Sequence, residues 1–584
     1  MVSHYQLWSR ACNRQTSTRV GSVNAARTAR DISTADSSIA PSFWHSPRTI
    51  VRHGASHLSR SWTSPFCPVP WTLCNFHLLP TASTTTAHFP RYRRGLSSRW
   101  ASSDLHHRVG KKTRPWTKVS RATKVQQWLE LGNKKYTKQN RSYIMADYFR
   151  QYVIVPYSKY RLDWFNDRPG DPTNIDDSLY DAAPFHHTPY VHKRLPKKLP
   201  TFVPEAWDEV QDTVDQLCGT DGIKWRAINV YKSSSRVTNA LISRMTLGLP
   251  FCRNEALRYR LRAFADHVWS CVAIEPLIPG LLKPILGWTI LTLPAKWHYL
   301  FTRSQLLPRI HSRLSEVAAA KQDTEKLAQL PDDYLTWHIR HATAQNDPKA
   351  LEPEFMSLTL LSLELSAGAN THHALANLLF DIFSSPPDQD VVQILRAELQ
   401  EMYINKYNGT WSQKCLRELY RMDSAIKESL RFSTITAHGT WRKVRAREGL
   451  LDPETGDVFP CGTTLGWDIW SRHHDTDIYE EPMEYDALRF YRMREQMLRD
   501  GGDALQLKKL SMTVAGSDLY LVFSTGRHAC PGRFLVSCMF KMVLAYILLH
   551  YDVEHPEKRA TSLWCGGLIL PSLRGEIKVK RLLD

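Results

Sequence analysis

The stretch that decides the fold reads Phe523-Ser-Thr-Gly526-Arg-His528-Ala-Cys530-Pro531-Gly532. It places one cysteine between a turn that contains Gly526 and a long apolar segment from Arg533 to His550. Glycine tolerates the positive φ of a tight turn, and proline favours the first turn of a helix. The stretch therefore predicts a helix whose positive end faces the Cys530 sulfur, which favours a thiolate able to bind iron. The alternative is a buried core cysteine, the usual position of a free thiol.

These ten residues resemble, in spacing and type, the haem-binding loop of the cytochrome P450 family. The resemblance puts Phe523, Gly526, Cys530 and Gly532 at the fixed positions of that loop. It implies a haem b cofactor, with Cys530 as the axial ligand of the iron. His528 stands where most members carry Arg, so a hydrogen bond from His528 to a haem propionate is implied. The implied fold is mainly α with small β-sheets, in one large catalytic domain.

A second motif, Glu428-Ser-Leu-Arg431, lies in the segment Leu416–Phe432, whose apolar residues recur at helical spacing. Alone, such a pair is most often a solvated ion pair on a helix surface. Its position 102 residues before Cys530 resembles that of the family's K helix. The stretch Tyr485-Asp-Ala-Leu-Arg489-Phe490 resembles the loop that supplies a second arginine. The resemblance implies a buried structural network of Glu428, Arg431 and Arg489.

The third motif lies in the segment from Phe355 to Phe383, which we expect to be one long buried helix that follows Pro353. Within it, Ala367-Gly368-Ala369-Asn370-Thr371-His372 resembles the family's oxygen-binding helix. Thr371 is thereby implied to deliver protons, with Asn370 in place of an acidic residue and His372 in place of a second hydroxyl. The proton path would then run through water or His372. A mid-helix threonine more commonly bonds back to a carbonyl one turn earlier, and this alternative stays open.

Two weaker features fit the same family. Arg442, eleven residues after Arg431, stands where the family often places a cation that binds a haem propionate, although it could equally be a solvated strand residue. The segment Val272–Pro294 is rich in Leu, Ile and Trp, but its prolines argue against a transmembrane helix. It resembles the lid between the F and G helices, which in membrane-bound relatives enters lipid; ordinary core packing is the alternative.

The resemblance covers about Arg121 to Asp584, so we expect a catalytic domain over 121–584 and a separate N-terminal segment over 1–120. The first 118 residues hold 17 Lys or Arg and three acidic residues, so they carry +14 of the net charge of +19. With no sustained periodicity, this segment is predicted to be largely disordered. The segment could be a targeting peptide or a basic arm that binds anionic partners. The favoured interpretation is that it is not native coding sequence, as would result from a misplaced start.

The cysteine pattern excludes other classes of site. The 11 cysteines form no C-x-x-C pair, so neither a zinc site nor a disulfide framework is indicated, and a reducing compartment is expected. No phosphate loop, flavin fingerprint or iron–sulfur spacing is present, so electrons must come from a partner. The family implies NADPH-cytochrome P450 reductase as that partner, dioxygen and an apolar small molecule as substrates, and no nucleic acid.

The function implied by the resemblance is monooxygenation of an unactivated C–H bond. The Cys530 loop and Asp423-Ser-Ala-Ile-Lys-Glu-Ser most resemble fungal members of natural-product pathways, which suggests a terpenoid-like or polyketide-like substrate. The family also implies the cytoplasmic face of the endoplasmic reticulum membrane, with the mitochondrion as an alternative. Asn370 and His372 slightly favour a second function, a haem-thiolate isomerase or dehydratase that does not use dioxygen. A basic binding protein with a vestigial haem fold is a third possibility.

Overall fold

The structure, a computed structural model, describes residues 143–147, 150–155, 188–274, 278, 282–320, 323–511, 513–517, 520–524, 529–565 and 567–583. All of them belong to one compact unit. The predicted N-terminal segment, residues 1–120, lies outside the described residues, as do Gly526 and His528.

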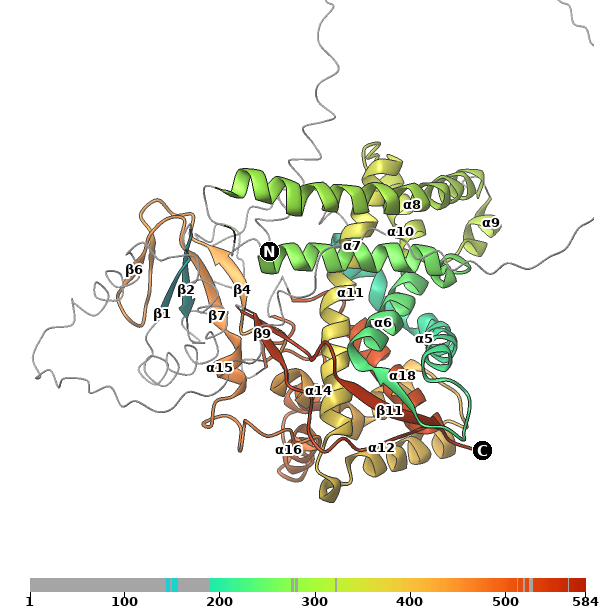
Figure 1. Cartoon of the computed structure of the whole chain (residues 1–584), viewed down its shortest axis with the longest axis vertical. Helices are drawn as coiled ribbons and strands as arrows, with labels where there is room; N and C mark the ends of the chain where they lie inside the picture. Colours follow the sequence, from blue (N-terminus) through green and yellow to red (C-terminus); the bar gives the residue numbers. More distant parts are fainter. Residues whose placement is uncertain are drawn as a thin grey trace, which may run out of the picture. The chain divides into compact units, whose positions relative to one another are not determined.

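Helices make up most of the described chain (Figure 1), which confirms the mainly α fold class. The longer helices are α5 (Thr188–Cys218), α6 (Val230–Thr246), α7 (Glu255–Ile274), α8 (Leu293–Ala320), α10 (Tyr334–Ala344), α11 (Pro353–Phe383), α12 (Val391–Leu399), α14 (Tyr420–Phe432), α16 (Arg489–Arg499) and α18 (Arg533–His550). The shorter ones are η5 (Phe251–Arg253), the π-helix η8 (Lys283–Thr292), α9 (Thr324–Gln329), η9 (Pro387–Gln389), η10 (Gln400–Lys406), α13 (Gln413–Glu418), α15 (Ile469–His473) and α17 (Ala504–Ser511).

The strands form four small sheets. The largest has the order β1-β2-β7-β4 and lies to one side of the helices in Figure 1. In it β2 pairs parallel with β7, whereas β1 pairs antiparallel with β2 and β4 antiparallel with β7. Its strands are β1 (Tyr143–Asp147), β2 (Arg150–Val155), β4 (His438–Lys443) and β7 (Thr464–Asp468). The smaller sheets are β3 (Arg226–Asn229) with β11 (Glu576–Arg581) and β8 (Tyr551–Val553), β9 (Leu563–Cys565) with β10 (Leu568–Leu570), and β5 (Leu450–Leu451) with β6 (Val458–Phe459).

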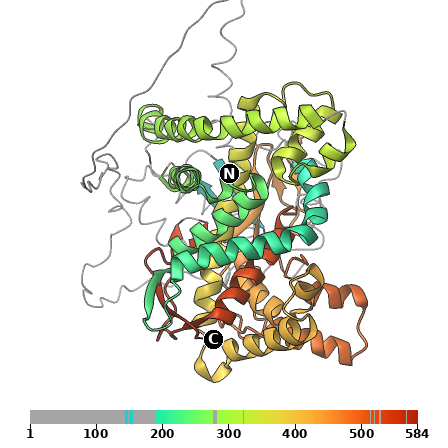
Figure 2. The ribbon, with the colours of Figure 1, turned by 90° about the vertical axis from the view of Figure 1, so that its right-hand side faces the viewer.

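Helix α11 runs through the middle of the helical part, with α7 and α8 across one end (Figures 1 and 2). It begins at Pro353, which is favoured in the first turn because its missing N–H has no partner to lose. Between Met356 and Phe383 every residue is buried except Leu358, Ser366, Ala367 and Asn370. Three of these exceptions lie together in the middle of the helix. The accessible part of this core helix therefore lies mainly near its centre.

The segment Leu416–Phe432 is not one helix, contrary to the sequence prediction. The chain breaks at Leu419 (φ −79°, ψ 75°), which separates α13 from α14. The Glu398 carboxylate of α12 accepts the N–H groups of Arg421 (2.7 Å) and Met422 (2.8 Å). A carboxylate in this position satisfies free N–H groups of the first turn and complements the helix dipole. The Glu398 carboxylate therefore caps the start of α14, at a point where the apolar pattern of the sequence continues without a break.

Helix α18 matches the predicted range, Arg533 to His550. Among the described helices it alone is long and apolar enough to span a membrane, but 67% of it is buried inside the protein. Its Lys541 ammonium is buried and donates to the Leu416 carbonyl (2.5 Å) and the Asp423 carboxylate of α14 (2.8 Å). These contacts identify α18 as a core helix fixed to α14.

Candidate functional site

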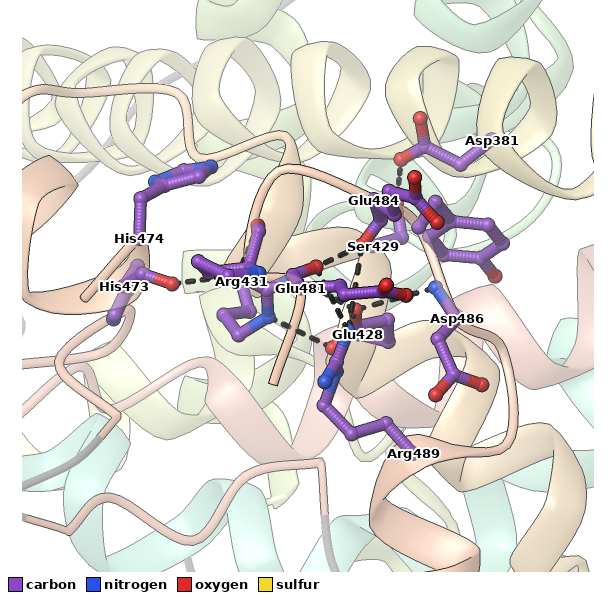
Figure 3. Close-up of polar contacts among 12 residues, drawn as sticks. Asp381, Glu428, Ser429, Arg431, His473, His474, Glu481, Glu484, Asp486 and Arg489 are labelled. Carbon is purple, nitrogen blue, oxygen red and sulfur yellow. Dashed lines mark hydrogen bonds and ion pairs between the residues drawn. The ribbon is translucent and has the colours of Figure 1, made fainter. Parts of the chain in front are cut away.

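The predicted network of Glu428, Arg431 and Arg489 is centred on the carboxylate of Glu428, which lies fully buried on α14. Arg431 donates to both of its oxygens, with Nε–Oε2 at 2.8 Å and Nη2–Oε1 at 2.7 Å. Arg489 approaches from the start of α16, with Nε–Oε1 at 3.0 Å (Figure 3). One carboxylate is thus shared by two guanidinium groups from segments about sixty residues apart in the chain. The structure brings together all three residues of the predicted network.

The same arginine connects this network to the cysteine loop. Arg431 Nη1 donates to the carbonyls of His473 (2.5 Å) and Pro482 (2.9 Å). The ring of His473 accepts the backbone N–H of Leu521, with N–Nε2 at 3.0 Å. Burial holds the pKa of His473 well below its usual range, so the ring is neutral and Nε2 can accept. Leu521 lies two residues before Phe523, so the network fixes the first residues of the loop.

Cys530 lies at the N-terminal end of α18, as the sequence predicts. Its own N–H donates to the Phe523 carbonyl (2.9 Å), which closes the loop. The backbone N–H groups of Gly532 and Arg533 are directed at its sulfur. A Cβ atom on Gly532 would lie 3.9 Å from that sulfur, so this side of the thiol is closely covered.

The charge state of the thiol depends on opposing effects. Burial raises the pKa of Cys530 above its ordinary value, whereas the N–H groups of Gly532 and Arg533 and the Arg533 charge lower it. The predicted thiolate belongs to the iron-bound state, in which the metal charge adds to these N–H groups. A cation at the sulfur, such as a bound iron, would have to supply the remaining stabilisation.

Strand β4 reaches the cysteine loop from the other side. Thr440, held at a φ of 55° by a β-bulge, donates its hydroxyl to Ser524 Oγ at 3.1 Å. Two residues on, Arg442 is 3% exposed and donates through Nη1 to the Trp441 carbonyl (3.0 Å). The alternative reading of Arg442 as a solvated strand residue is therefore wrong. A cation from β4 lies buried on the strand that contacts the loop.

The hydroxyl groups of α11 distinguish Thr371 from its neighbours. The hydroxyls of Ser357, Thr359, Ser362 and Ser366 all donate to helix carbonyls three or four residues earlier. The Thr371 side chain is buried, and no hydrogen bond joins its hydroxyl to a described residue. The back-bonded alternative for Thr371 is thus not what the structure shows. Thr371 follows directly after the accessible residue Asn370, so its hydroxyl is free for other partners.

Comparison with known proteins decides the family. The family model described as cytochrome P450 matches residues 186–579, about two thirds of the chain. The chain belongs to the cytochrome P450 family. Similar proteins include the cytochrome P450 monooxygenase polB of Polytolypa hystricis, 27% identical over 477 residues, which are 78% of this chain and 88% of polB. The cytochrome P450 monooxygenase gloP of Glarea lozoyensis is 26% identical over 528 residues, 85% of this chain and 94% of gloP. The cytochrome P450 monooxygenase lnaC of Aspergillus flavus is 28% identical over 468 residues.

This P450 is therefore a haem-thiolate monooxygenase that uses dioxygen, an organic substrate and a redox partner. The residues at Cys530 fit the haem iron: a sulfur donor, two N–H groups directed at it and the positive end of a core helix. The similar proteins are all named as monooxygenases, so the alternative isomerase or dehydratase gains no support. The described sheet begins at Tyr143, so the P450 body extends upstream of the family match.

Sequence reasoning missed two residues that connect separate segments around this site. One is the buried His473, which joins Arg431 to the loop. The other is the half-buried Arg559, whose guanidinium donates to Asp381 and Asn377 of α11 and to Ser433 just after α14. No local pattern marks these residues, because each contacts segments more than forty residues away.

We expect Arg431→Ala to yield almost no soluble haem-containing protein. The change leaves the fully buried Glu428 with one cation, and breaking a buried pair costs about 3–5 kcal/mol. Haem content per protein in purified fractions measures the effect. Arg492→Ala is the control, because the Arg492–Asp486 pair is exposed and its loss should change the free energy of unfolding by less than ~0.5 kcal/mol. Normal haem content in Arg431→Ala would contradict a structural role for the network.

We expect Cys530→Ser to abolish the red-shifted Soret band of the reduced carbon monoxide complex, because a serine oxygen cannot replace the thiolate donor. The same substitution at the exposed Cys461 should leave that band unchanged. The measurement is a carbon monoxide difference spectrum on protein with equal haem content. A normal band in Cys530→Ser would assign the iron to another ligand.

Proposed function

We propose that Cys530 binds the haem iron and that the enzyme hydroxylates, or otherwise oxidises, an apolar small molecule of fungal secondary metabolism. The observation that carries the site is the covered Cys530 thiol, which faces the positive end of α18 and two backbone N–H groups. Phe523 and Gly532 hold the loop on either side. Gly526 and His528 are proposed to complete it, the latter toward a haem propionate.

The bound haem supplies the oxygen chemistry, and the thiolate donor favours cleavage of the O–O bond. The polypeptide positions the reactants, excludes water from the site and supplies protons. Arg442 is proposed to bind a haem propionate, since it is a buried cation on the strand that contacts the cysteine loop. Thr371 is proposed to donate its free hydroxyl to the reacting oxygen, beside the half-buried amide of Asn370.

An organic substrate is proposed to lie beside the centre of α11. Ser366, Ala367 and Asn370 are the residues there that are not fully buried. Small side chains at this point leave room for a ligand beside the helix. The similar monooxygenases come from fungi, which is consistent with secondary metabolism. The terpenoid-like or polyketide-like substrate is proposed from the resemblance of the cysteine loop alone.

Electrons are proposed to come from NADPH-cytochrome P450 reductase. The first turns of α5 expose a basic patch of His192, Lys193, Arg194 and Lys197. The Arg533 charge lowers the pKa of His192, after the larger effect of burial, so this patch lies near the Cys530 end of α18. A basic patch close to the iron ligand favours an acidic redox partner and speeds its association.

Membrane association is proposed to involve the segment Val272–Pro294, which resembles the lid, together with the beginning of α8. Eight large apolar side chains between residues 282 and 301 are 39–64% exposed. They are Leu282, Ile285, Trp288, Ile290, Leu293, Trp297, Leu300 and Phe301. Exposed Trp and Ile side chains on adjacent helices are typical of a surface that enters the lipid interface. The cytoplasmic face of the endoplasmic reticulum membrane is proposed as the location. A catalytic domain over 121–584 and a separate segment over 1–120 are also proposed.

We expect Thr371→Ala to keep the carbon monoxide spectrum but to divert electrons to peroxide. Loss of a positioned proton donor typically costs about 10²-fold in the assisted step. The measurement is hydrogen peroxide released per NADPH oxidised, with reductase present. Thr359→Val is the control, because the Thr359 hydroxyl is already used by the Phe355 carbonyl. An unchanged peroxide ratio in Thr371→Ala would give Thr371 a packing role only.

We expect the triple variant Ile285→Ser, Trp288→Ser, Trp297→Ser to bind liposomes of phosphatidylcholine and phosphatidylserine at least ~10-fold more weakly. Each exposed apolar side chain that enters lipid contributes about 1.5–3 kcal/mol when fully buried. Cosedimentation measures the effect, and haem content serves as the control for folding. Equal binding by the variant would move the membrane contact elsewhere in the protein.

A further inference from the structure

The segment between β8 and β9 runs along the C-terminal end of α11. Arg559 of this segment donates through Nη2 to Asn377 Oδ1 (3.0 Å) and through Nε to Asp381 Oδ1 (2.5 Å). The ring of His555 lies with Nε2 2.8 Å from the Ser385 carbonyl, just after the end of α11. Residues spaced by four positions lie on the same side of a helix. The segment therefore contacts the end of α11 at three points along one side.

The same side of α11 is joined to the end of α14. The Ser429 hydroxyl donates to Asp381 Oδ2 at 2.6 Å (Figure 3). Just after α14, Ser433 Oγ donates to Asp381 Oδ1 (3.0 Å), and Asn377 Nδ2 donates to the Ser433 carbonyl (3.1 Å). Arg559 completes the set, because its Nη2 also donates to Ser433 Oγ (2.9 Å). One guanidinium thus holds groups of both helices at the same place.

The charge of Asp381 is balanced by Arg559. The Asp381 side chain is fully buried, and within the described part of the chain Arg559 is the only cation paired with it. A buried carboxylate is stable only when it is paired and hydrogen-bonded. The Arg559 side chain is 23% exposed, so it reaches this interface from the solvent side. The contact between α11 and α14 therefore requires a residue that neither helix supplies.

This contact lies between the two parts of the site. Ser429 follows directly after Glu428, the carboxylate whose network reaches the start of the cysteine loop through His473. At the other end of the contact, Asp381 lies ten residues after Thr371, about 15 Å along α11. The contact thus connects the helix that carries Thr371 to the loop that carries the proposed iron ligand.

We propose that Arg559 is a positioning residue, which sets the place of α11 relative to the cysteine loop by holding Asp381 against the end of α14. The inference rests on the proposed roles of Cys530 and α11. A guanidinium binds several acceptors in one fixed plane, so it fixes geometry as well as charge. A ligand that lies between the cysteine loop and α11 then meets a space whose width depends on Arg559. Binding of a bulky ligand is sensitive to that width, whereas binding of a small one is not.

The test measures ligand binding by the full haem-containing enzyme rather than its turnover. Imidazole and phenylimidazole both bind haem iron through a nitrogen and shift its Soret band, but the second is much larger. We expect Arg559→Gln to change the dissociation constant of phenylimidazole by at least ~5-fold, with that of imidazole within about two-fold of the wild-type value. Arg559→Lys keeps the charge but not the planar fork, so it should lie between the two.

Arg396→Gln is the matched control. The Arg396 side chain is 24% exposed, and it too connects separate segments, from α12 to the end of α18. Its Nε and Nη2 donate to the carbonyls of Leu548 (3.0 Å) and Tyr551 (2.9 Å). We expect Arg396→Gln to lower the thermal midpoint of unfolding as Arg559→Gln does, but to leave both dissociation constants unchanged.

Unchanged binding of phenylimidazole by folded Arg559→Gln would overturn the proposal and would give Arg559 a role in stability alone. Equal changes for both ligands would also overturn it, because they indicate a general disturbance of the haem site. If Arg559→Gln does not fold, the double variant Asp381→Asn, Arg559→Gln removes the buried charge together with its partner, and the same outcomes apply. Failure of the proposed function looks different, because the wild type would then lack the thiolate carbon monoxide spectrum.

Discussion

The rest of the site depends on the buried carboxylate of Glu428. A fully buried charge is stable only when it is paired and hydrogen-bonded, and here two arginines from separate segments satisfy it. Arg431 uses its remaining N–H groups on the carbonyls of His473 and Pro482. His473 in turn accepts from Leu521 at the start of the cysteine loop. The start of the Cys530 loop is thus connected to an ion pair on another helix through His473.

Cys530 lies between opposing electrostatic effects. The backbone N–H groups of Gly532 and Arg533 are directed at its sulfur and lower its pKa, whereas burial raises it. Metal binding to a cysteine requires the thiolate, so a bound iron would couple cofactor binding to deprotonation.

Helix α11 combines two properties that usually exclude each other. It is almost fully buried, yet its centre is open at Ser366, Ala367 and Asn370. Of its five hydroxyl side chains, four donate to helix carbonyls, and no hydrogen bond joins the fifth, Thr371, to a described residue.

The sequence by itself determined the features that depend on local spacing. These are the cysteine loop, the ranges of α11 and α18, and the Glu428–Arg431 pair, because helix periodicity and turn residues act within a few positions. It could not determine the break at Leu419, which comes from the Glu398 carboxylate about twenty residues upstream, or the burial of Arg442. It also left open whether the Thr371 hydroxyl was free and could not reveal the link through His473. Tertiary structure decided these points, because the partners and the burial of a polar atom depend on segments that only folding brings together.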